Sequence, residues 1–139
     1  MGFDTSVVVA IFFVAALILG TSAYSTISMA DSDVDDASEE RFKMEFARLH
    51  TDLEITGVDN PDNTSLIISM TNTGSRTIDA SCLSVLVDGA LREYSYDPPY
   101  TWTPLEDYEI SVALPVENEH RIKVVTENGV ADYYVYMSI

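Results

Sequence analysis

The chain contains one cysteine, Cys82, among its 139 residues. A single cysteine excludes an intrachain disulfide, and with it the class of small secreted domains held together by disulfide frameworks. It does not exclude an extracellular location. Cys82 lies between Ser81 and Leu83, and we expect it to be a small residue in or near the core rather than a reactive thiol.

Basic residues are also scarce. The chain has 7 Lys and Arg against 23 Asp and Glu, a formal net charge of −16. A nucleic acid would be repelled by this charge, and no basic stripe is present to displace its counterions, so we expect no nucleic-acid partner. Acidity of this degree suits a salt-rich setting or a basic partner, and it also simply keeps a domain soluble.

Motifs for catalysis and metal binding are missing. The two histidines, His50 and His120, have no ligand-type residue at the spacing of a zinc site. The acidic run 31–40 begins like a calcium loop, but Asp36 replaces the turn glycine and Phe42 replaces the bidentate glutamate. No nucleophile elbow or phosphate-binding glycine loop is present either. We therefore expect no enzyme activity, no catalytic residues, no metal site and no cofactor.

The N-terminal segment is long and apolar. Residues 5–30 carry no charge, and as a helix they would be about 39 Å long, enough to cross a bilayer. We expect residues 1–30 to form a single membrane helix, with Tyr24 suited to an interface. Its central membrane-spanning residues are Val7, Val8, Val9, Ile11, Phe12, Phe13, Val14, Leu17, Ile18 and Leu19.

A cleaved signal peptide is the main alternative for this segment, because Thr21-Ser22-Ala23 offers small residues for cleavage. The residues before the apolar run, 1–4, lack the Lys or Arg that a signal peptide has, which favours a retained anchor. Orientation stays open from charge alone. Arg41, Lys43 and Arg48 would place the following side in the cytoplasm, but they lie beyond the acidic run.

Residues 31–50 are predicted to be an acidic spacer and helical stalk. Phe42, Phe46 and Leu49 recur at helical spacing and line one face. This stripe could extend the membrane helix, dock on the next domain or self-associate, and we expect a homo-oligomer. It is too short to indicate a coiled coil.

Residues 51–139 are predicted to be a β domain, because the period of the apolar residues changes to two. We expect this domain to lie outside the cytoplasm on its character and on the family resemblance given below. Leu66, Ile68 and Met70 share a face, and several later runs repeat the alternation: Leu83, Val85 and Val87; Tyr108, Ile110, Val112 and Leu114; Ile122 and Val124; Tyr133, Val135 and Met137. Asp88-Gly89 and Asn128-Gly129 are signals for two-residue hairpins. About seven short strands in this length predict an immunoglobulin-like β-sandwich, with a small closed barrel as the alternative.

Two surface features are candidates for recognition. Tyr94, Tyr96, Tyr100 and Trp102 lie in a Pro-containing segment, residues 94–104, that could be a partner-contact loop. The alternative, which we favour, is that the rings pack over the open end of the sandwich. On that reading Trp102 lies outside the core. Asn63-Thr64-Ser65 fits the N-glycosylation pattern, so Asn63 is a candidate modification site.

The order of several short elements resembles a known family. Met1-Gly2-Phe3 leads into the uncharged segment, and Thr51-Asp52-Leu53-Glu54-Ile55-Thr56 opens the β domain. Asn72-Thr73-Gly74-Ser75, the hairpin 85–89 and the closing segment 121–132 follow. In this order the chain resembles the archaellum accessory protein F family, and the related accessory protein G is the second choice.

The resemblance implies a membrane-anchored β-sandwich between the cytoplasmic membrane and the surface layer (S-layer). It also implies S-layer binding, work with accessory protein G, and a stationary place in the archaellum motor. Two alternatives remain: a filament subunit whose helices bundle in the filament core, and a small ligand-binding domain. No contact residue follows from the resemblance, and residues 94–104 lie outside the matched elements.

Overall fold

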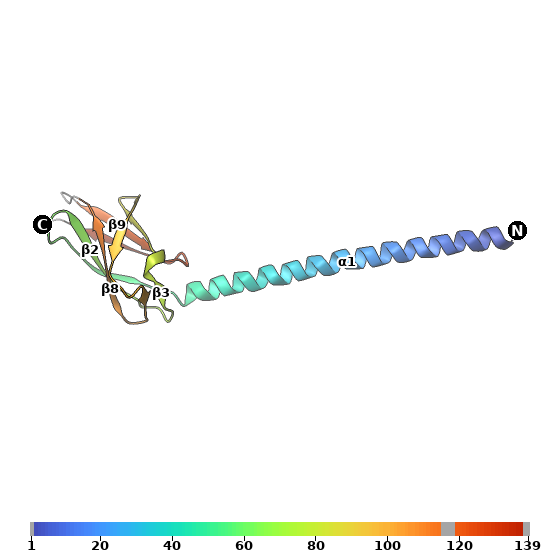
Figure 1. Cartoon of the computed structure of the whole chain (residues 1–139), viewed down its shortest axis with the longest axis horizontal. Coiled ribbons are helices and arrows are strands. Elements are labelled where there is room, and N and C mark those ends of the chain that lie inside the picture. Colours follow the sequence, from blue (N-terminus) through green and yellow to red (C-terminus); the bar gives the residue numbers. More distant parts are fainter. Residues whose placement is uncertain (1, 115–118, 138–139) are drawn as a thin grey trace. The chain divides into compact units, whose positions relative to one another are not determined.

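The structure is a computed structural model in which residues 2–114 and 119–137 are described (Figure 1). The chain divides after Lys43 into two units. One is the helix up to Lys43. The other is the β domain together with the last turn of the helix, from Met44 onward. The two units are described separately below.

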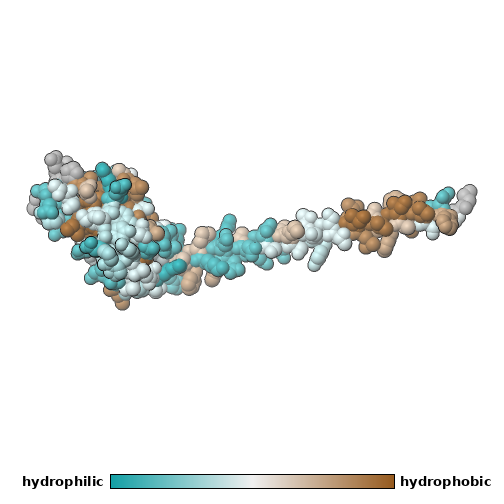
Figure 2. Space-filling model, viewed as in Figure 1, coloured by the Kyte–Doolittle hydropathy of each residue, from teal (hydrophilic) through white to brown (hydrophobic). Residues whose placement is uncertain are grey.

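A single helix, α1 (Gly2–Leu49), covers both the predicted membrane segment and the predicted stalk without a break. Its apolar residues are concentrated near the N-terminus and its acidic residues follow, as the colours of Figure 2 show. The helix is long and apolar enough to cross a membrane. Phe42, Phe46 and Leu49 are exposed, whereas Ala47 is the buried residue of the last turns.

The β domain contains two four-stranded antiparallel sheets and a small two-stranded one. The first sheet has the order β1-β2-β8-β6, the second has the order β10-β9-β4-β5, and β3 pairs with β7. In chain order the strands are β1 (Glu54–Asp59), β2 (Ser65–Thr71), β3 (Ile78–Asp79), β4 (Ser84–Val87), β5 (Ala90–Arg92), β6 (Tyr94–Tyr96), β7 (Thr101–Trp102), β8 (Asp107–Ala113), β9 (His120–Val125) and β10 (Ala131–Tyr136); a 3-10 turn, η1 (Ala80–Cys82), follows β3.

The core lies between the two sheets, as alternation along each strand requires. Leu66, Ile68 and Met70 on β2 are completely buried. On β9, Val124 is completely buried and Ile122 is 1% exposed. Among the described residues the strands pair into separate sheets rather than one closed sheet, so the domain is a sandwich rather than a closed barrel. The prediction of an immunoglobulin-like β-sandwich after one long apolar helix is confirmed.

Two assignments of buried residues made from the sequence are wrong. Cys82 is exposed, because it ends the η1 turn rather than lying in a strand. On β10, Tyr133 and Val135 point outward and Tyr134 and Tyr136 pack against the core. Every residue of β10 is apolar or aromatic on both faces after Asp132, so its alternation does not reveal which face is buried.

The two predicted hairpin turns differ. Asp88 and Gly89 have positive φ values of 53° and 82°, which is the type I′ turn that the sequence predicts between β4 and β5. At Asn128-Gly129 only Gly129 has a positive φ, 77°. Here a longer loop is closed by Thr126, whose N–H donates to the Val130 carbonyl at 2.8 Å. The two-residue turn predicted at that position is therefore wrong.

The end of α1 is fastened to the β domain by backbone hydrogen bonds. The N–H groups of Ser75 and Arg76 donate to the His50 carbonyl at 3.0 and 3.1 Å, and the Gly74 N–H donates to Asp52 at 3.1 Å. A Cβ at Gly74 would lie 2.5 Å from the Asp52 nitrogen and 2.7 Å from the His50 oxygen. Only glycine allows this close approach.

Asn72, which begins this loop, is completely buried and uses its whole amide group. Its Nδ2 donates to the carbonyls of Arg76 at 2.8 Å and Trp102 at 3.1 Å, and its Oδ1 accepts from Gly74 at 3.1 Å. A buried amide with every site satisfied fixes the loop in one conformation. The element Asn72–Ser75 is thus a structural joint between the helix end and the sandwich.

Candidate interaction surface

The helix presents the candidate membrane segment. Its predicted membrane-spanning residues are all exposed, from Val7 at 48% to Phe12 and Leu19 at 71%. The hydroxyl of Thr21 donates to the carbonyls of Leu17 and Ile18, and that of Thr26 donates to Ser22. Hydroxyls that bond back to their own helix are compatible with an apolar surrounding.

The outer face of the β10-β9-β4-β5 sheet is more apolar than the outer face of the β1-β2-β8-β6 sheet. A row of outward side chains crosses all four strands: Tyr133 pairs with Lys123, Lys123 with Leu86, and Leu86 with Leu91. Leu91 and Tyr133 are 71% and 67% exposed. Val135 and Arg121 form the next pair. We call Leu86, Leu91, Arg121, Lys123, Tyr133 and Val135 the apolar–basic face.

Both charged residues of the apolar–basic face are cations. The Lys123 Nζ lies 5.2 Å from the centre of the Tyr133 ring, a cation–π distance. Within residues 2–114 and 119–137, neither Arg121 nor Lys123 forms an ion pair with a carboxylate. Asp88 lies at the end of the face, where it accepts from the Arg121 backbone N–H at 2.9 Å. Two cations, Arg121 and Lys123, therefore lie on this face in a chain of charge −16, with the Asp88 carboxylate at its end.

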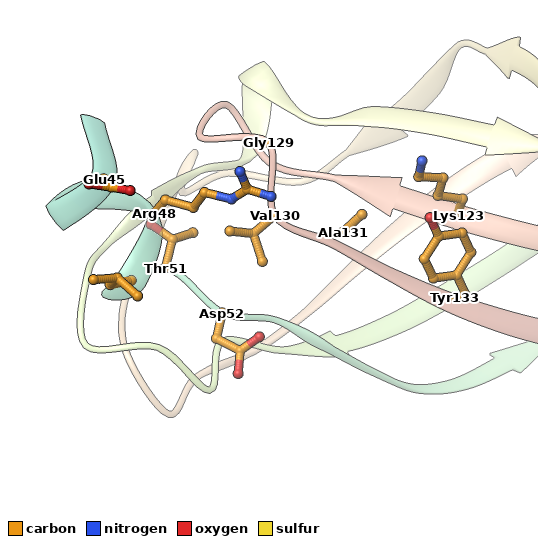
Figure 3. Close-up of a pocket in the computed structure, with 10 residues that line it drawn as sticks. Glu45, Arg48, Thr51, Asp52, Lys123, Gly129, Val130, Ala131 and Tyr133 are labelled. Carbon is orange, nitrogen blue, oxygen red and sulfur yellow. The ribbon is translucent and has the colours of Figure 1, made fainter. Parts of the chain in front are cut away.

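A pocket of about 690 Å³ adjoins this face and shares Lys123 and Tyr133 with it. Arg48 and Lys123 lie at opposite ends of the pocket, with Val130 and Ala131 between them (Figure 3). Thr51 lines the wall and accepts a hydrogen bond from Asn128 Nδ2 at 2.9 Å. The pocket therefore has an apolar floor, and its charged lining residues are two cations, Arg48 and Lys123, and two carboxylates, Glu45 and Asp52.

The outer face of the β1-β2-β8-β6 sheet has the opposite character. Its outward positions are mainly hydroxyl and carboxylate residues, and these bond to each other across the strands. Thr71 donates to Asp107 at 2.5 Å and Ser69 donates to Glu109 at 3.3 Å. We call Ser69, Thr71, Asp107 and Glu109 the acid–hydroxyl face.

The predicted contact segment 94–104 is mostly structural. Trp102 is completely buried on β7, and its Nε1 donates to the Glu106 carbonyl at 2.6 Å. The expectation that it lies outside the core is wrong, because β7 pairs with β3 and turns the indole inward. Trp102 therefore offers no surface to a partner.

The tyrosines of this segment differ in exposure. Tyr94 is partly buried; its hydroxyl donates to Ala80 at 2.8 Å and accepts from the Leu83 N–H at 3.1 Å. Burial raises the pKa of Tyr94 above its ordinary value. The Tyr96 ring packs against Tyr94 and Tyr100, with centroids 5.5 and 5.4 Å away. Tyr100 is 55% exposed and is the residue of the four that is most available to a partner.

Asn63 lies in the loop between β1 and β2, with an exposed side chain and a φ of 54°. Its Oδ1 accepts a 3.4 Å hydrogen bond from Asn60. The nitrogen that glycosylation would modify is not used in that bond. Glycosylation of Asn63 stays a prediction.

Several carboxylates of the domain stabilise local structure by accepting hydrogen bonds from nearby residues. The Asp88 carboxylate accepts one hydrogen bond from the Arg121 N–H and another, of 2.6 Å, from His120 Nδ1. These hydrogen bonds lower the pKa of Asp88. Hydrogen bonds from Ser81 lower the pKa of Asp79, and those from Thr103 lower the pKa of Glu106. Across the described part of the chain, no three His, Cys, Asp or Glu side chains are grouped to hold a metal ion.

Comparison with known proteins concerns the sandwich. No protein-family model and no curated protein matches the sequence. Among solved structures, the archaellum periplasmic stator protein FlaG from Sulfolobus acidocaldarius aligns with a TM-score of 0.53 and 22% identity, covering 62% of this chain and 99% of FlaG. The chain has the fold of an archaellum stator protein.

A second structure, the stator protein complex of FlaF and FlaG from the same organism, aligns with a TM-score of 0.51 and 19% identity. The alignment covers 60% of this chain and 87% of the matched chain. The resemblance to the archaellum accessory proteins is thus confirmed at the level of the fold. Accessory protein G, the second choice from the sequence, is the protein named in the first of these structures.

Proposed function

We propose that this chain is a membrane-anchored stator component of the archaellum, the archaeal motility machinery, and that it binds the S-layer and tethers the motor. The observation that carries the proposal is one combination: an archaellum stator fold joined to a helix whose apolar part is exposed. A helix with such a surface needs an apolar surrounding, and a lipid bilayer supplies one. The helix then holds the sandwich at the membrane.

The joint at Asn72–Ser75 supports a tethering role. Three backbone hydrogen bonds and a buried amide connect the last helical turn with the sandwich. A pull on the sandwich would therefore reach the last turns of α1, from Met44 onward, through hydrogen-bonded structure. The antiparallel sheets share such a load across many lateral hydrogen bonds.

The partners in this proposal are the S-layer protein and accessory protein G, and the protein acts as a homo-oligomer. A solved complex of two archaellum stator proteins, FlaF and FlaG, supports pairing with another accessory protein. The sandwich lies outside the cytoplasm, at the cell surface. No enzymatic step is part of the proposal.

The test is binding of full-length protein to isolated S-layer. The protein is reconstituted in vesicles, and co-sedimentation with S-layer is measured at several salt concentrations, with protein-free vesicles as the control. Saturable binding is expected. No saturable binding at any salt concentration would contradict the tether.

Cys82 allows a direct test of orientation because it is exposed and is the single cysteine of the chain. A maleimide reagent that cannot cross membranes should label it in intact cells that make the full-length protein. The variant Cys82→Ser is the control for specificity. Labelling that requires permeabilised cells would place the sandwich in the cytoplasm.

The second candidate is a filament subunit of the archaellin or pilin type, with the helices bundled in the filament core. The exposed apolar helix favours it as much as a membrane anchor, because both surroundings are apolar. Long ordered fibres formed by the full-length protein without lipid would support the subunit. Protein that is monodisperse in detergent and enters vesicles would support the anchor.

A further inference from the structure

We propose that the partner of the sandwich docks on the apolar–basic face and its adjoining pocket, and that the docking surface of this partner is a protein surface with carboxylates around an apolar centre. The inference rests on the proposed function, because that function supplies the partner, the S-layer, used in the test. It adds the site and the chemistry of the contact.

The first argument is the apolar content of the face. Leu91 on β5 is 71% exposed, and Tyr133 and Val135 on β10 are 67% and 48% exposed. These are the two edge strands of one sheet, and Leu86 on β4 and Lys123 on β9 lie between them. The fold does not require this, because the outer face of the other sheet is covered by hydroxyl and carboxylate residues. A contiguous exposed apolar patch is typical of a protein-interaction site.

The second argument is charge complementarity. The outward positions of β4, β9 and β10 that are described carry Arg121 and Lys123 and no carboxylate, in a chain with 23 acidic residues. Cations at the edge of an apolar contact select a partner with acidic groups around its own apolar centre. Contact between two such faces of this chain would place Arg121 and Lys123 against the same residues of a second copy, which disfavours a self-contact.

The third argument is the pocket. It continues the face at Lys123 and Tyr133 and ends at Arg48. Pockets beside a flat apolar surface accept the anchor side chain of a partner, and such anchors supply much of the binding energy. Val130 and Ala131 form an apolar floor for an anchor side chain (Figure 3). Arg48 and Lys123 are balanced by Glu45 and Asp52 in the lining, so the pocket adds apolar contact to the docking surface rather than net positive charge.

The segment 94–104 is a weaker candidate for the same role. Trp102 is buried and Tyr94 is committed to hydrogen bonds with η1 and with Leu83. Tyr100 alone of the four aromatic residues predicted from the sequence is more than half exposed. It therefore serves as the matched control.

The charge test uses full-length protein in vesicles and isolated S-layer as the probe. The double variant Arg121→Glu/Lys123→Glu should bind roughly tenfold or more weakly than wild type near 0.1 M salt. Salt screens the charges, so wild-type affinity should fall with added salt and that of the variant should rise. The control Arg41→Glu/Lys43→Glu has the same net charge change on exposed positions of α1 and should bind like wild type.

The apolar test compares Tyr133→Thr with Tyr100→Thr. Threonine keeps the strand propensity of the exposed β position of Tyr133, and Tyr100 lies outside the strands, before β7. Both variants should therefore fold, which thermal melting checks. Tyr133→Thr should weaken S-layer binding by about fivefold or more, and Tyr100→Thr should not change it. The same vesicle assay serves for both.

The outcomes separate the two proposals. If wild type does not bind S-layer, the tether fails, and the docking site fails with it. If wild type binds and the face variants bind equally well, the docking site is overturned and the tether stands. Loss of binding in Tyr100→Thr alone would assign the contact to residues 94–104. Loss of self-association without loss of S-layer binding would make the face a contact between copies of this chain and would also overturn the inference.

Discussion

The two sheets of the sandwich share one core but present opposite surfaces. The β1-β2-β8-β6 sheet is covered by hydroxyl and carboxylate side chains that bond to each other, as between Ser69 and Glu109. The β10-β9-β4-β5 sheet exposes Leu91, Tyr133 and Val135 beside two cations. Packing explains the inward faces of both sheets, but it explains neither outward face.

The difference between the two outer faces distinguishes residues that the fold requires from residues that it does not require. A solvated outer face can be made from serine, threonine and acids at no cost to the core, and the first sheet shows this. An apolar outer face makes no contribution to the core and raises the risk of aggregation. Its presence on one sheet only is therefore evidence of a partner.

The largest effect is expected from a charged substitution at an inward position, which tests the assignment of inward and outward strand faces. Ile110→Asp on β8 should destabilise the domain by about 4 kcal/mol or more, because Ile110 is 1% exposed and the carboxylate would have no partner in the core. The neighbouring change Ser111→Asp, on the outward side of the same strand, should alter stability by less than about 1 kcal/mol. Both are measured by thermal or urea unfolding of the full chain. Similar melting of the two variants would refute the assigned strand facing.

The inward faces could be predicted from the sequence where polar residues mark the other side. On β8 the alternation of Glu109 and Ser111 with Ile110 and Val112 identifies the buried face. On β10 no such mark exists after Asp132, since Tyr133 to Tyr136 are all apolar or aromatic. The facing of β10 depends on how β9 pairs with it, which is a tertiary property.

The candidate surface could not be predicted for the same reason. It assembles outward residues from four strands that are distant in sequence, among them Leu86, Leu91, Lys123 and Tyr133. The sequence drew attention instead to the aromatic residues near Trp102, because they lie close together along the chain. Burial of Trp102 follows from the β3–β7 pairing, and two-residue strands leave no periodic signal.

The two sheets should also differ in how strongly they hold the helix end. Gly74→Ala, in the loop that follows β2, should cost about 2–4 kcal/mol, because its Cβ would meet backbone atoms of Asp52 and His50 at 2.5 and 2.7 Å. On the other sheet, Asn128→Ala removes one hydrogen bond to Thr51 and should cost about 1 kcal/mol.

Unfolding by urea compares these variants, and Gly57→Ala is the control because a Cβ there meets nothing within 4 Å. We expect the control to change stability by less than about 1 kcal/mol. If Gly74→Ala is no more damaging than Gly57→Ala, the joint is not the rigid connection described above.

The facing of β10 gives a smaller but direct comparison. Tyr134 packs against the core and Tyr133 is 67% exposed, so Tyr134→Thr should destabilise the domain by about 1–2 kcal/mol and Tyr133→Thr by much less. Melting temperatures of the two variants measure the difference. The opposite order would restore the facing expected from the sequence and remove Tyr133 from the apolar–basic face.

The smallest effect concerns Asp88, at the end of the apolar–basic face. The Arg121 N–H and His120 lower the pKa of Asp88 below 3.8, its value without such contacts. A carboxylate with a lowered pKa stabilises the folded state above the unfolded pKa, and this contribution is lost as pH falls through the folded pKa. The melting temperature of wild type should therefore exceed that of Asp88→Asn near pH 7, and the gap should close below pH 3.8. Asparagine tolerates the positive φ of this turn position, so the backbone conformation is kept.

The opposite sheet offers the control: Glu109→Gln alters a carboxylate held only by a 3.3 Å hydrogen bond from Ser69. If the Glu109→Gln gap closes over the same pH range and by the same amount, the Asp88 contacts add nothing beyond the loss of one surface charge.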